Sequence, residues 1–136
     1  MTALPPPGPG PVFPDPGHLP DPEFIAVEDW VEEYFIPVFR RPLGGEFRWC
    51  ARWWAHEEAV LILICLWHSW EVFRLEPGTG MMTWLRDCLQ PELPVLMGRM
   101  GPFCQCTERE HMALNPARII APPPGWLSGG PSGAAA

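Results

Sequence analysis

The sequence predicts an all-α domain of three helices, flanked by proline-rich tails without regular structure. Three observations lead to this prediction: apolar residues recur at helical spacing, glycine and proline separate the periodic stretches, and prolines are concentrated near both ends of the chain. The chain has 136 residues, 20 of them proline, which leaves enough sequence for one small domain. We place that domain at residues 21–118, between a disordered leader at 1–20 and a disordered tail at 119–136.

The first predicted helix is Asp21–Ile36. Asp21 is a good N-cap residue, and Pro22 fits the first helical position because that position needs no backbone N–H. The residues that follow form one apolar stripe with acidic residues on the opposite side, as expected of a helix that packs on a core. Pro37 predicts that this helix ends near Ile36 or bends there.

The second predicted helix, Phe47–Leu75, is the longest and carries most of the tryptophans. Its length of roughly 40 Å makes it the centre of the predicted fold. Between Ala59 and Trp67 it is apolar on every side, so it must be covered all round. Two neighbouring helices do not suffice for this in so small a domain. We therefore expect a protein partner or a second copy of the chain against the central helix, through Trp54, Leu61, Ile62, Cys65 and Leu66.

The third predicted helix, Met81–Leu89, is shorter. Pro91 and Pro94 follow it and predict its end, since each proline removes a backbone donor. The stretch Leu93–Phe103 fits either a short hairpin or an irregular segment that crosses the helices, and its sequence leaves both interpretations open.

Composition excludes several classes of protein. The formal net charge of −7 argues against a generally basic nucleic-acid-binding surface and against a polybasic membrane anchor. The longest apolar run, residues 59–67, is too short for a membrane span, which takes about 20 residues. The proline-rich N-terminus has no secretory signal, and an odd number of cysteines, 5, then predicts reduced thiols in the cytoplasm.

Six cysteine and histidine residues are candidate zinc ligands: Cys50, His56, Cys88, Cys104, Cys106 and His111. Their spacing differs from that of common zinc motifs, because no paired C-x-x-C is present. On a continuous helix Cys50 and His56 would point about 120° apart, so they converge only if Cys50 precedes the helix. Buried free cysteines and core histidines explain the same residues without metal, and the sequence favours that interpretation. Apart from this candidate zinc, no cofactor is predicted.

An alternative interpretation is a nucleic-acid interface in an Arg- and Trp-rich stretch, formed by Arg40, Arg41, Arg48, Arg52, Trp53 and Trp54. Arginines interleaved with aromatic residues suit phosphate contacts and base stacking. The same arginines can instead pair with Glu33, Glu57 or Glu58 and stack on tryptophans inside the fold. The acidity of the chain favours this second interpretation. No group of residues has the arrangement of a catalytic site, so we expect a protein without enzymatic activity.

The central part of the chain resembles the actinobacterial family known as domain of unknown function 4913. The resemblance extends from about Trp30 to His111, and its most unusual block is Arg48-Trp-Cys-Ala-Arg-Trp-Trp. Cys88 stands where the resemblance implies His, which weakens the case for this residue as a ligand. The resemblance implies no activity. It implies a small protein of a high-GC actinobacterium, encoded on a plasmid, an integrative element or a phage.

These observations predict a non-enzymatic accessory module of a mobile element, which acts through protein contacts of its central helix as a homodimer or with a partner, and without a membrane. Two alternatives stay open. One is an accessory protein that binds nucleic acid through the Arg- and Trp-rich stretch. The other is a small domain stabilised by zinc.

Overall fold

The computed structural model describes residues 13–15 and 17–129, and in these residues the chain forms three helical segments and no strand. The first segment joins α1 (Val27–Trp30), the π-helical turn η1 (Val31–Phe35) and α2 (Ile36–Val38). The second is α3 (Glu57–Phe73), preceded by the 3₁₀ turn η2 (Trp53–Ala55). The third joins α4 (Gly80–Trp84), the π-helical turn η3 (Leu85–Leu89) and α5 (Gln90–Met97). The predicted all-helical fold is confirmed for the described residues.

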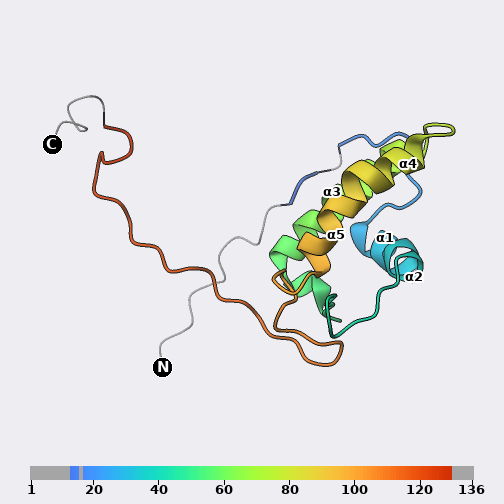
Figure 1. The fold of residues 1–136 in the computed structure, drawn as a ribbon. Helices are drawn as coiled ribbons and strands as arrows, with labels where there is room; N and C mark the ends of the chain where they lie inside the picture. Colours follow the sequence, from blue (N-terminus) through green and yellow to red (C-terminus); the bar gives the residue numbers. More distant parts are fainter. Residues whose placement is uncertain (1–12, 16, 130–136) are drawn as a thin grey trace, which may run out of the picture.

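The third segment turns back along α3, and the first segment packs against both, as Figure 1 shows. Trp30 lies at the centre of this packing with no exposed surface. Its ring is 6.2 Å from that of Trp70 in α3 and 6.3 Å from that of Trp84 in α4, between ring centroids. Each helical segment therefore contributes a tryptophan to a shared aromatic core. Such large rings bury much apolar area when they pack together.

The first helix begins at Val27 and not at Asp21, so the predicted N-cap is wrong. Asp21 adopts a positive φ of 46°, and the chain after it crosses α3 before it enters α1. The reason is a long-range contact. The backbone N–H groups of Glu23 and Phe24, which a helix would leave for its N-cap, donate to the carboxylate of Glu71 at 2.9 and 2.8 Å.

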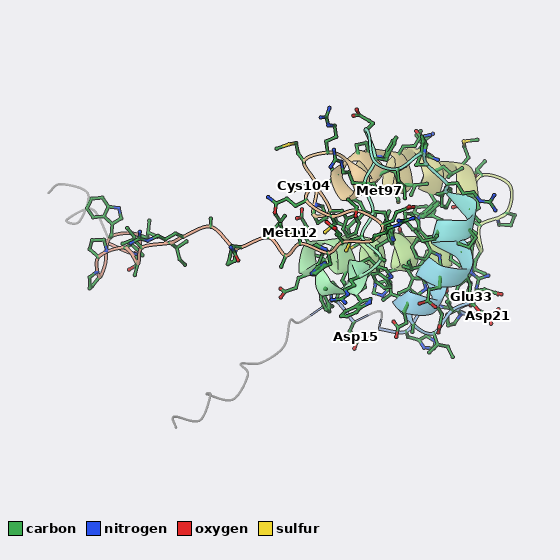
Figure 2. The ribbon with its side chains drawn as sticks, turned by 90° about the horizontal axis from the view of Figure 1, so that it is seen from below. Asp15, Asp21, Glu33, Met97, Cys104 and Met112 are labelled. Atoms are coloured by element: carbon green, nitrogen blue, oxygen red, sulfur yellow. The ribbon has the colours of Figure 1, made fainter. Side chains whose placement is uncertain are left out.

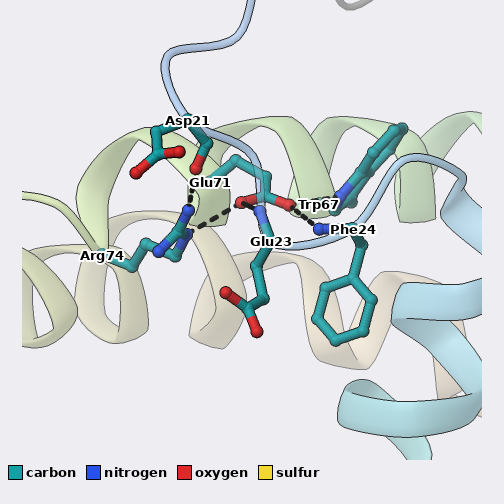
Figure 3. A network of polar contacts seen from close by, with 6 residues as sticks. All are labelled: Asp21, Glu23, Phe24, Trp67, Glu71 and Arg74. Carbon is teal, nitrogen blue, oxygen red and sulfur yellow. Dashed lines mark hydrogen bonds and ion pairs between the residues drawn. The ribbon is translucent and has the colours of Figure 1, made fainter.

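Glu71 is the centre of this polar network, drawn in Figure 3, and its side chain has no exposed surface. Besides the two backbone groups, its carboxylate accepts hydrogen bonds from the Trp67 indole at 3.1 Å and the Arg74 guanidinium at 2.8 Å. Arg74 also donates to the carbonyl of Asp21. A buried carboxylate with this many donors ties the segment before α1 to α3.

The second predicted helix, Phe47–Leu75, is longer than the observed one, since α3 begins at Glu57, well after Phe47, and ends at Phe73, shortly before Leu75. In the structure, the backbone at 47–48 pairs with the end of α5 instead. Phe47 forms bridges with Leu43 and Gly98, and the Arg48 N–H donates to the carbonyl of Met97 at 2.6 Å. These contacts between distant parts of the chain override a helical periodicity that the local sequence does carry.

The third helix continues past both prolines to Met97, so the predicted end at Leu89 is wrong. The hairpin and the irregular segment are both wrong for the first part of Leu93–Phe103, which is helical. A π-helical turn precedes Pro91, and Pro91 then occupies the first turn of α5, where no N–H is needed. The same arrangement recurs at Pro37, which follows η1. Pro94 costs α5 a backbone hydrogen bond, but burial of Leu93, Leu96 and Met97 on the core retains the helix.

The apolar run Ala59–Trp67 is covered only in part by the described chain. Most of its side chains are buried, including Leu66, which lies in the core and so leaves the predicted interface. Leu61 is 43% exposed, Cys65 is exposed and Ile62 is half-buried. The outer face of α3 is therefore open in a single copy.

The predicted disordered leader and tail fall in part on residues outside the described ranges, namely 1–12, 16 and 130–136. Phe13 and Leu19, which are described, pack partly buried against the core. The described residues after Met112 are all exposed and run away from the helices. Among the described helices, none has both the length and the apolar character needed to cross a membrane.

Candidate metal centre

Four of the six predicted zinc ligands come together in the structure: Cys50, His56, Cys106 and His111. One ligand atom from each residue lies within 4.8 Å of those of the other three. Cys50 and His56 belong to the loop before α3, whereas Cys106 and His111 belong to the turns after α5. The group therefore joins two loops that are about fifty residues apart in sequence.

The distances within the group suit a tetrahedral ion. Cys50 Sγ lies 3.2 Å from His111 Nδ1, Cys106 Sγ lies 3.4 Å from His56 Nε2, and Cys106 Sγ lies 4.0 Å from His111 Nδ1. Zinc bonds of about 2.3 Å to sulfur and about 2.0 Å to nitrogen place tetrahedral ligands about 3.3–3.8 Å apart. The separations of 3.2 and 3.4 Å are close to these values, the third is 4.0 Å, and all four atoms lie within 4.8 Å of one another.

The local backbone explains why Cys50 and His56 converge. The sequence requires Cys50 to precede the helix if the two residues are to face each other, and this condition is met because α3 begins only at Glu57. His56 is the N-cap residue of α3, with the extended dihedral angles φ −105° and ψ 105°. Its ring consequently points off the end of the helix toward Cys106.

The turn after α5 positions Cys106 through Phe103, which is fully buried. The Cys106 N–H donates to the carbonyl of Phe103 at 3.0 Å, and the Phe103 ring packs edge-on against His56 at 5.1 Å and against Trp49 at 4.9 Å, between centroids. The ligands thus stand on a rigid apolar floor. Such a floor limits water access and holds the ligand geometry.

Burial shifts the pKa of two members of the group, Cys50 and His56. It raises the pKa of the Cys50 thiol, against the opposing backbone N–H of Arg52, and the neighbouring Cys106 raises this pKa further. Burial also lowers the pKa of His56, and the adjacent His111 adds to this effect. His56 is therefore neutral at physiological pH, and a neutral imidazole is the form that binds metal.

Met112 provides an additional contact that the sequence did not indicate. Its backbone N–H donates to Cys106 Sγ at 3.3 Å. The Cys106 thiol in turn donates to the Met112 carbonyl at 3.3 Å, so the two contacts hold the sulfur in place. Figure 2 shows Met112 at the point where the C-terminal segment leaves the helical body. In the sequence, only the position of Met112 directly after His111 could have indicated this contact.

The other two predicted ligands lie elsewhere. Cys88 is half-buried on η3 and packs against the core. Cys104 is also half-buried, and its carbonyl accepts a hydrogen bond from Arg48 at 3.2 Å. Neither belongs to the group of four. In the C-x-C sequence, the second cysteine alone faces the other ligands.

The arginines of the predicted nucleic-acid interface engage mainly backbone carbonyls. Arg40 donates to Pro37, Arg41 to Arg40, and Arg48 to Gly45 and Cys104, while Arg41 also lies over the Phe47 ring. None of them forms an ion pair with a carboxylate in the described part of the chain, so the expected pairing with Glu33, Glu57 or Glu58 is absent there. Trp53 is buried and Trp54 is exposed.

Comparison with known proteins gives one match. The family model for a domain of unknown function, DUF4913, matches residues 24–124, a range that includes all four members of the Cys/His group. None of the curated proteins and none of the solved structures matches the chain.

Proposed function

The chain belongs to the DUF4913 family of unknown function, and on that premise we propose that it is a small helical binding module whose fold is held by one structural zinc ion. The observation that carries this proposal is the convergence of two cysteine sulfurs and two histidine nitrogens from two distant loops, all within 4.8 Å. The ligands would be Cys50, His56, Cys106 and His111.

The donor set favours zinc over other common divalent ions. Two thiolates and two imidazoles are the ligand types that zinc prefers, whereas magnesium and calcium take oxygen ligands. The local fold supplies three of the ligands from buried positions, and His111, which is half-buried, closes the group from the solvent side. We expect the ion to be retained during purification.

Four protein ligands also favour a structural over a catalytic ion. Catalytic zinc keeps a coordination position for water or substrate, and a tetrahedral site with four protein ligands leaves none. This supports a role in binding rather than catalysis. The accessory role on an actinobacterial mobile element, which the resemblance implies, belongs to the same proposal.

The ion would pin the C-terminal segment to the helices. Of the described residues after Cys106, His111 alone is half-buried and all others are exposed. In the described ranges, the contact between His111 Nδ1 and Cys50 Sγ is the one polar contact that joins the residues after Cys106 to a residue before it. The other polar contacts of this segment are local. Metal at the group therefore determines how firmly residues 107–112 are held.

Elemental analysis of the full-length protein, purified without added metal, tests the proposal. We expect one zinc per chain. Replacement by Co²⁺ is expected to give the visible absorption bands of a tetrahedral site together with a thiolate charge-transfer band. His111→Ala and Cys50→Ser are expected to abolish both the zinc and the cobalt spectrum.

Two cysteines outside the group provide matched controls. Cys104→Ser and Cys88→Ser change the same atom type in the same fold, and we expect both variants to keep one zinc and an unchanged cobalt spectrum. Metal-free wild-type protein whose melting temperature does not respond to added zinc or to a chelator would overturn the structural role. An octahedral cobalt spectrum would overturn the assigned ligands.

A further inference from the structure

The described part of the chain includes an exposed segment after residue 116 whose apolar side chains are not buried against the helices. Residues 117–129, which we name the C-terminal arm, are all exposed and run away from the helices (Figures 1 and 2). Ile119 is 89% exposed and Ile120 is 83% exposed. The arm carries one charge, that of Arg118, and no acidic residue. Extended segments with exposed apolar side chains are typical of chains that order on a partner.

A hollow elsewhere on the molecule is apolar, like the arm, and could receive it. It has a volume of about 410 Å³ and lies between α1 and the start of α3, lined by Phe13, Val27, Trp53, Trp54, Val60 and Ile64. Val60 and Ile64 form a buried apolar floor, and Trp54 stands beside it as a wall that is 64% exposed. An exposed tryptophan over an apolar floor is typical of protein-binding surfaces.

The rim of this hollow is acidic. Glu28 and Glu32 line it from the first helical segment, and both are exposed. Neither forms an ion pair with any residue in the described part of the chain. We name the hollow with its rim the acid-rimmed groove. It offers apolar area and uncompensated negative charge, whereas the arm offers apolar side chains beside one positive charge.

We propose that the C-terminal arm of one copy of this chain docks in the acid-rimmed groove of a second copy. Ile119 and Ile120 cover the apolar floor beside Trp54, and Arg118 lies against Glu28 and Glu32. If each copy gives its arm to the other, the contact closes with two-fold symmetry and produces a dimer rather than a fibre. Dimerisation rests on the binding role proposed above, but not on the metal.

The course of the chain supports a second copy rather than the same one. Residues 113–116 line one hollow together with Ala55, His56 and Glu57 at the start of α3, so the arm leaves the body from this end of α3. Pro116 restricts the residue before it to extended backbone, and in the structure the arm then runs outward. Pro122 restricts Ala121 to extended backbone, and a turn follows in which the Trp126 N–H donates to the Pro123 carbonyl at 3.0 Å.

Analytical ultracentrifugation of the full-length, zinc-loaded protein over a range of concentrations tests this proposal. We expect a reversible monomer–dimer equilibrium. Ile119→Ser combined with Ile120→Ser removes the apolar part of the contact, and we expect the dimer dissociation constant to rise about tenfold or more. Met100→Ser is the matched control, because Met100 is 94% exposed and lies outside both arm and groove, so the dissociation constant is expected to stay unchanged.

Charge reversal then distinguishes exchange between copies from folding back within one copy. Arg118→Glu alone and Glu28→Arg with Glu32→Arg are each expected to weaken the dimer. In a mixture of the two variants, both arm–groove contacts of a mixed pair join opposite charges, so we expect heterodimers tighter than either homodimer. A groove filled by its own arm gives no such rescue and would overturn the proposal.

Two further outcomes would also overturn it: a wild-type protein that stays monomeric at all concentrations, or a dimer that Leu61→Ser weakens and the arm variants do not. The latter would place the interface on the outer face of α3. Zinc content is measured in every variant. Full zinc with no dimer contradicts the arm contact alone, whereas a metal-free dimer contradicts the zinc site alone.

Discussion

Two irregular segments, one on each side of the helical part, are held to the helices by different chemistry. The segment before α1 is held by Glu71, whose buried carboxylate accepts hydrogen bonds from two backbone N–H groups, one indole and one guanidinium. The segment after α5 is held at the Cys/His group, where four potential metal ligands face one another. The first attachment is made of a carboxylate and its hydrogen-bond donors, and the second is made of atoms that are typical metal ligands.

The difference follows from the donor and acceptor balance at each site. A carboxylate surrounded by N–H donors is satisfied, and its charge is compensated by Arg74. Two sulfurs and two imidazole nitrogens aimed at one point offer mostly acceptors, which a divalent cation satisfies better than the thiol protons do. The two attachments are therefore expected to respond to different treatments: the first to acid and to loss of Glu71, the second to chelators and to loss of a ligand.

Loss of the metal is expected to have the largest effect. In Cys106→Ser, or in wild-type protein treated with a chelator, we expect the free energy of unfolding to fall by about 4 kcal/mol or more, the amount that a tightly bound ligand contributes. Hydrogen exchange is expected to speed up at residues 104–112 and not at residues 21–26. Thermal unfolding and exchange mass spectrometry measure the two effects.

The control for this experiment is Cys104→Ser, which keeps all four members of the group. It is expected to unfold near the wild-type temperature and to remain sensitive to chelator. If chelation speeds up exchange equally in both irregular segments, the two attachments are not independent and the comparison fails.

Removal of the Glu71 side chain is expected to have the next largest effect. Glu71→Ala leaves the Arg74 charge and the Trp67 indole without their acceptor, and the loss of one partner from a buried pair costs about 3–5 kcal/mol. Urea unfolding of zinc-loaded protein measures this loss. Exchange is expected to accelerate at residues 21–26, while the zinc content stays at one per chain. Glu71→Gln, which retains an acceptor oxygen, is expected to lose less.

Acid is expected to weaken the same attachment by a smaller amount. Burial alone would raise the pKa of Glu71, but the hydrogen bonds from Glu23, Phe24, Arg74 and Trp67 outweigh burial and lower it. In the unfolded chain a glutamate side chain has a pKa of about 4.3. The stability that Glu71 contributes is therefore complete above this pH and is lost as the pH falls through the lower pKa of the folded state.

Comparison of wild type with Glu71→Gln isolates this contribution, because the Cys/His group is the same in both proteins. The difference between their free energies of unfolding is expected to shrink as the pH falls below about 4.3. A difference that stays constant down to the lowest pH at which the protein folds would contradict the lowered pKa.

Much of the fold could be predicted from the sequence, because helix formation in α3 depends on local periodicity. The three helical segments were of this kind. The wrong starts of the first two helices share one physical cause, a contact with a distant residue. Glu71 takes the N–H groups that would have started a helix near Asp21, and Met97 takes the N–H of Arg48.

The prolines misled the prediction in a different way. Pro37 and Pro91 each follow a π-helical turn, which lets the helix continue where a regular turn would have ended. Neither turn has a signature in the sequence. Helix ends inferred from proline alone were therefore too early.

The candidate site was predicted as a set of residues but not as a geometry. All four members of the group were among the six candidates, since cysteine and histidine are recognisable as ligands in any sequence. The exclusion of Cys104 depends on which way the turns after α5 face, and this follows from the burial of Phe103. Cys88 is excluded because it lies on η3 and packs against the core. Glu71 escaped notice because a single acidic residue on a helix resembles a solvent-exposed one.

The smallest expected effect concerns Arg48, which links the two loops of the Cys/His group without metal. Its guanidinium donates to the carbonyls of Gly45 and Cys104, so it joins the stretch before Cys50 to the turn before Cys106. Arg48→Ala is expected to lower the free energy of unfolding by about 1 kcal/mol, the size of one hydrogen bond, and to leave the zinc content unchanged. The matched control is Arg99→Ala, which removes an exposed arginine for which the described residues give no such bond.

Arg48→Ala, combined with Arg52→Ala, tests the nucleic-acid alternative. A nucleic-acid-binding surface predicts salt-dependent binding that the double variant weakens, whereas a purely structural Arg48 changes stability alone. The loss of stability in Arg48→Ala is expected to be larger after chelation, because its guanidinium bonds then hold the two loops without the ion. An equal loss with and without zinc would show that the ion and the arginine stabilise the loops independently.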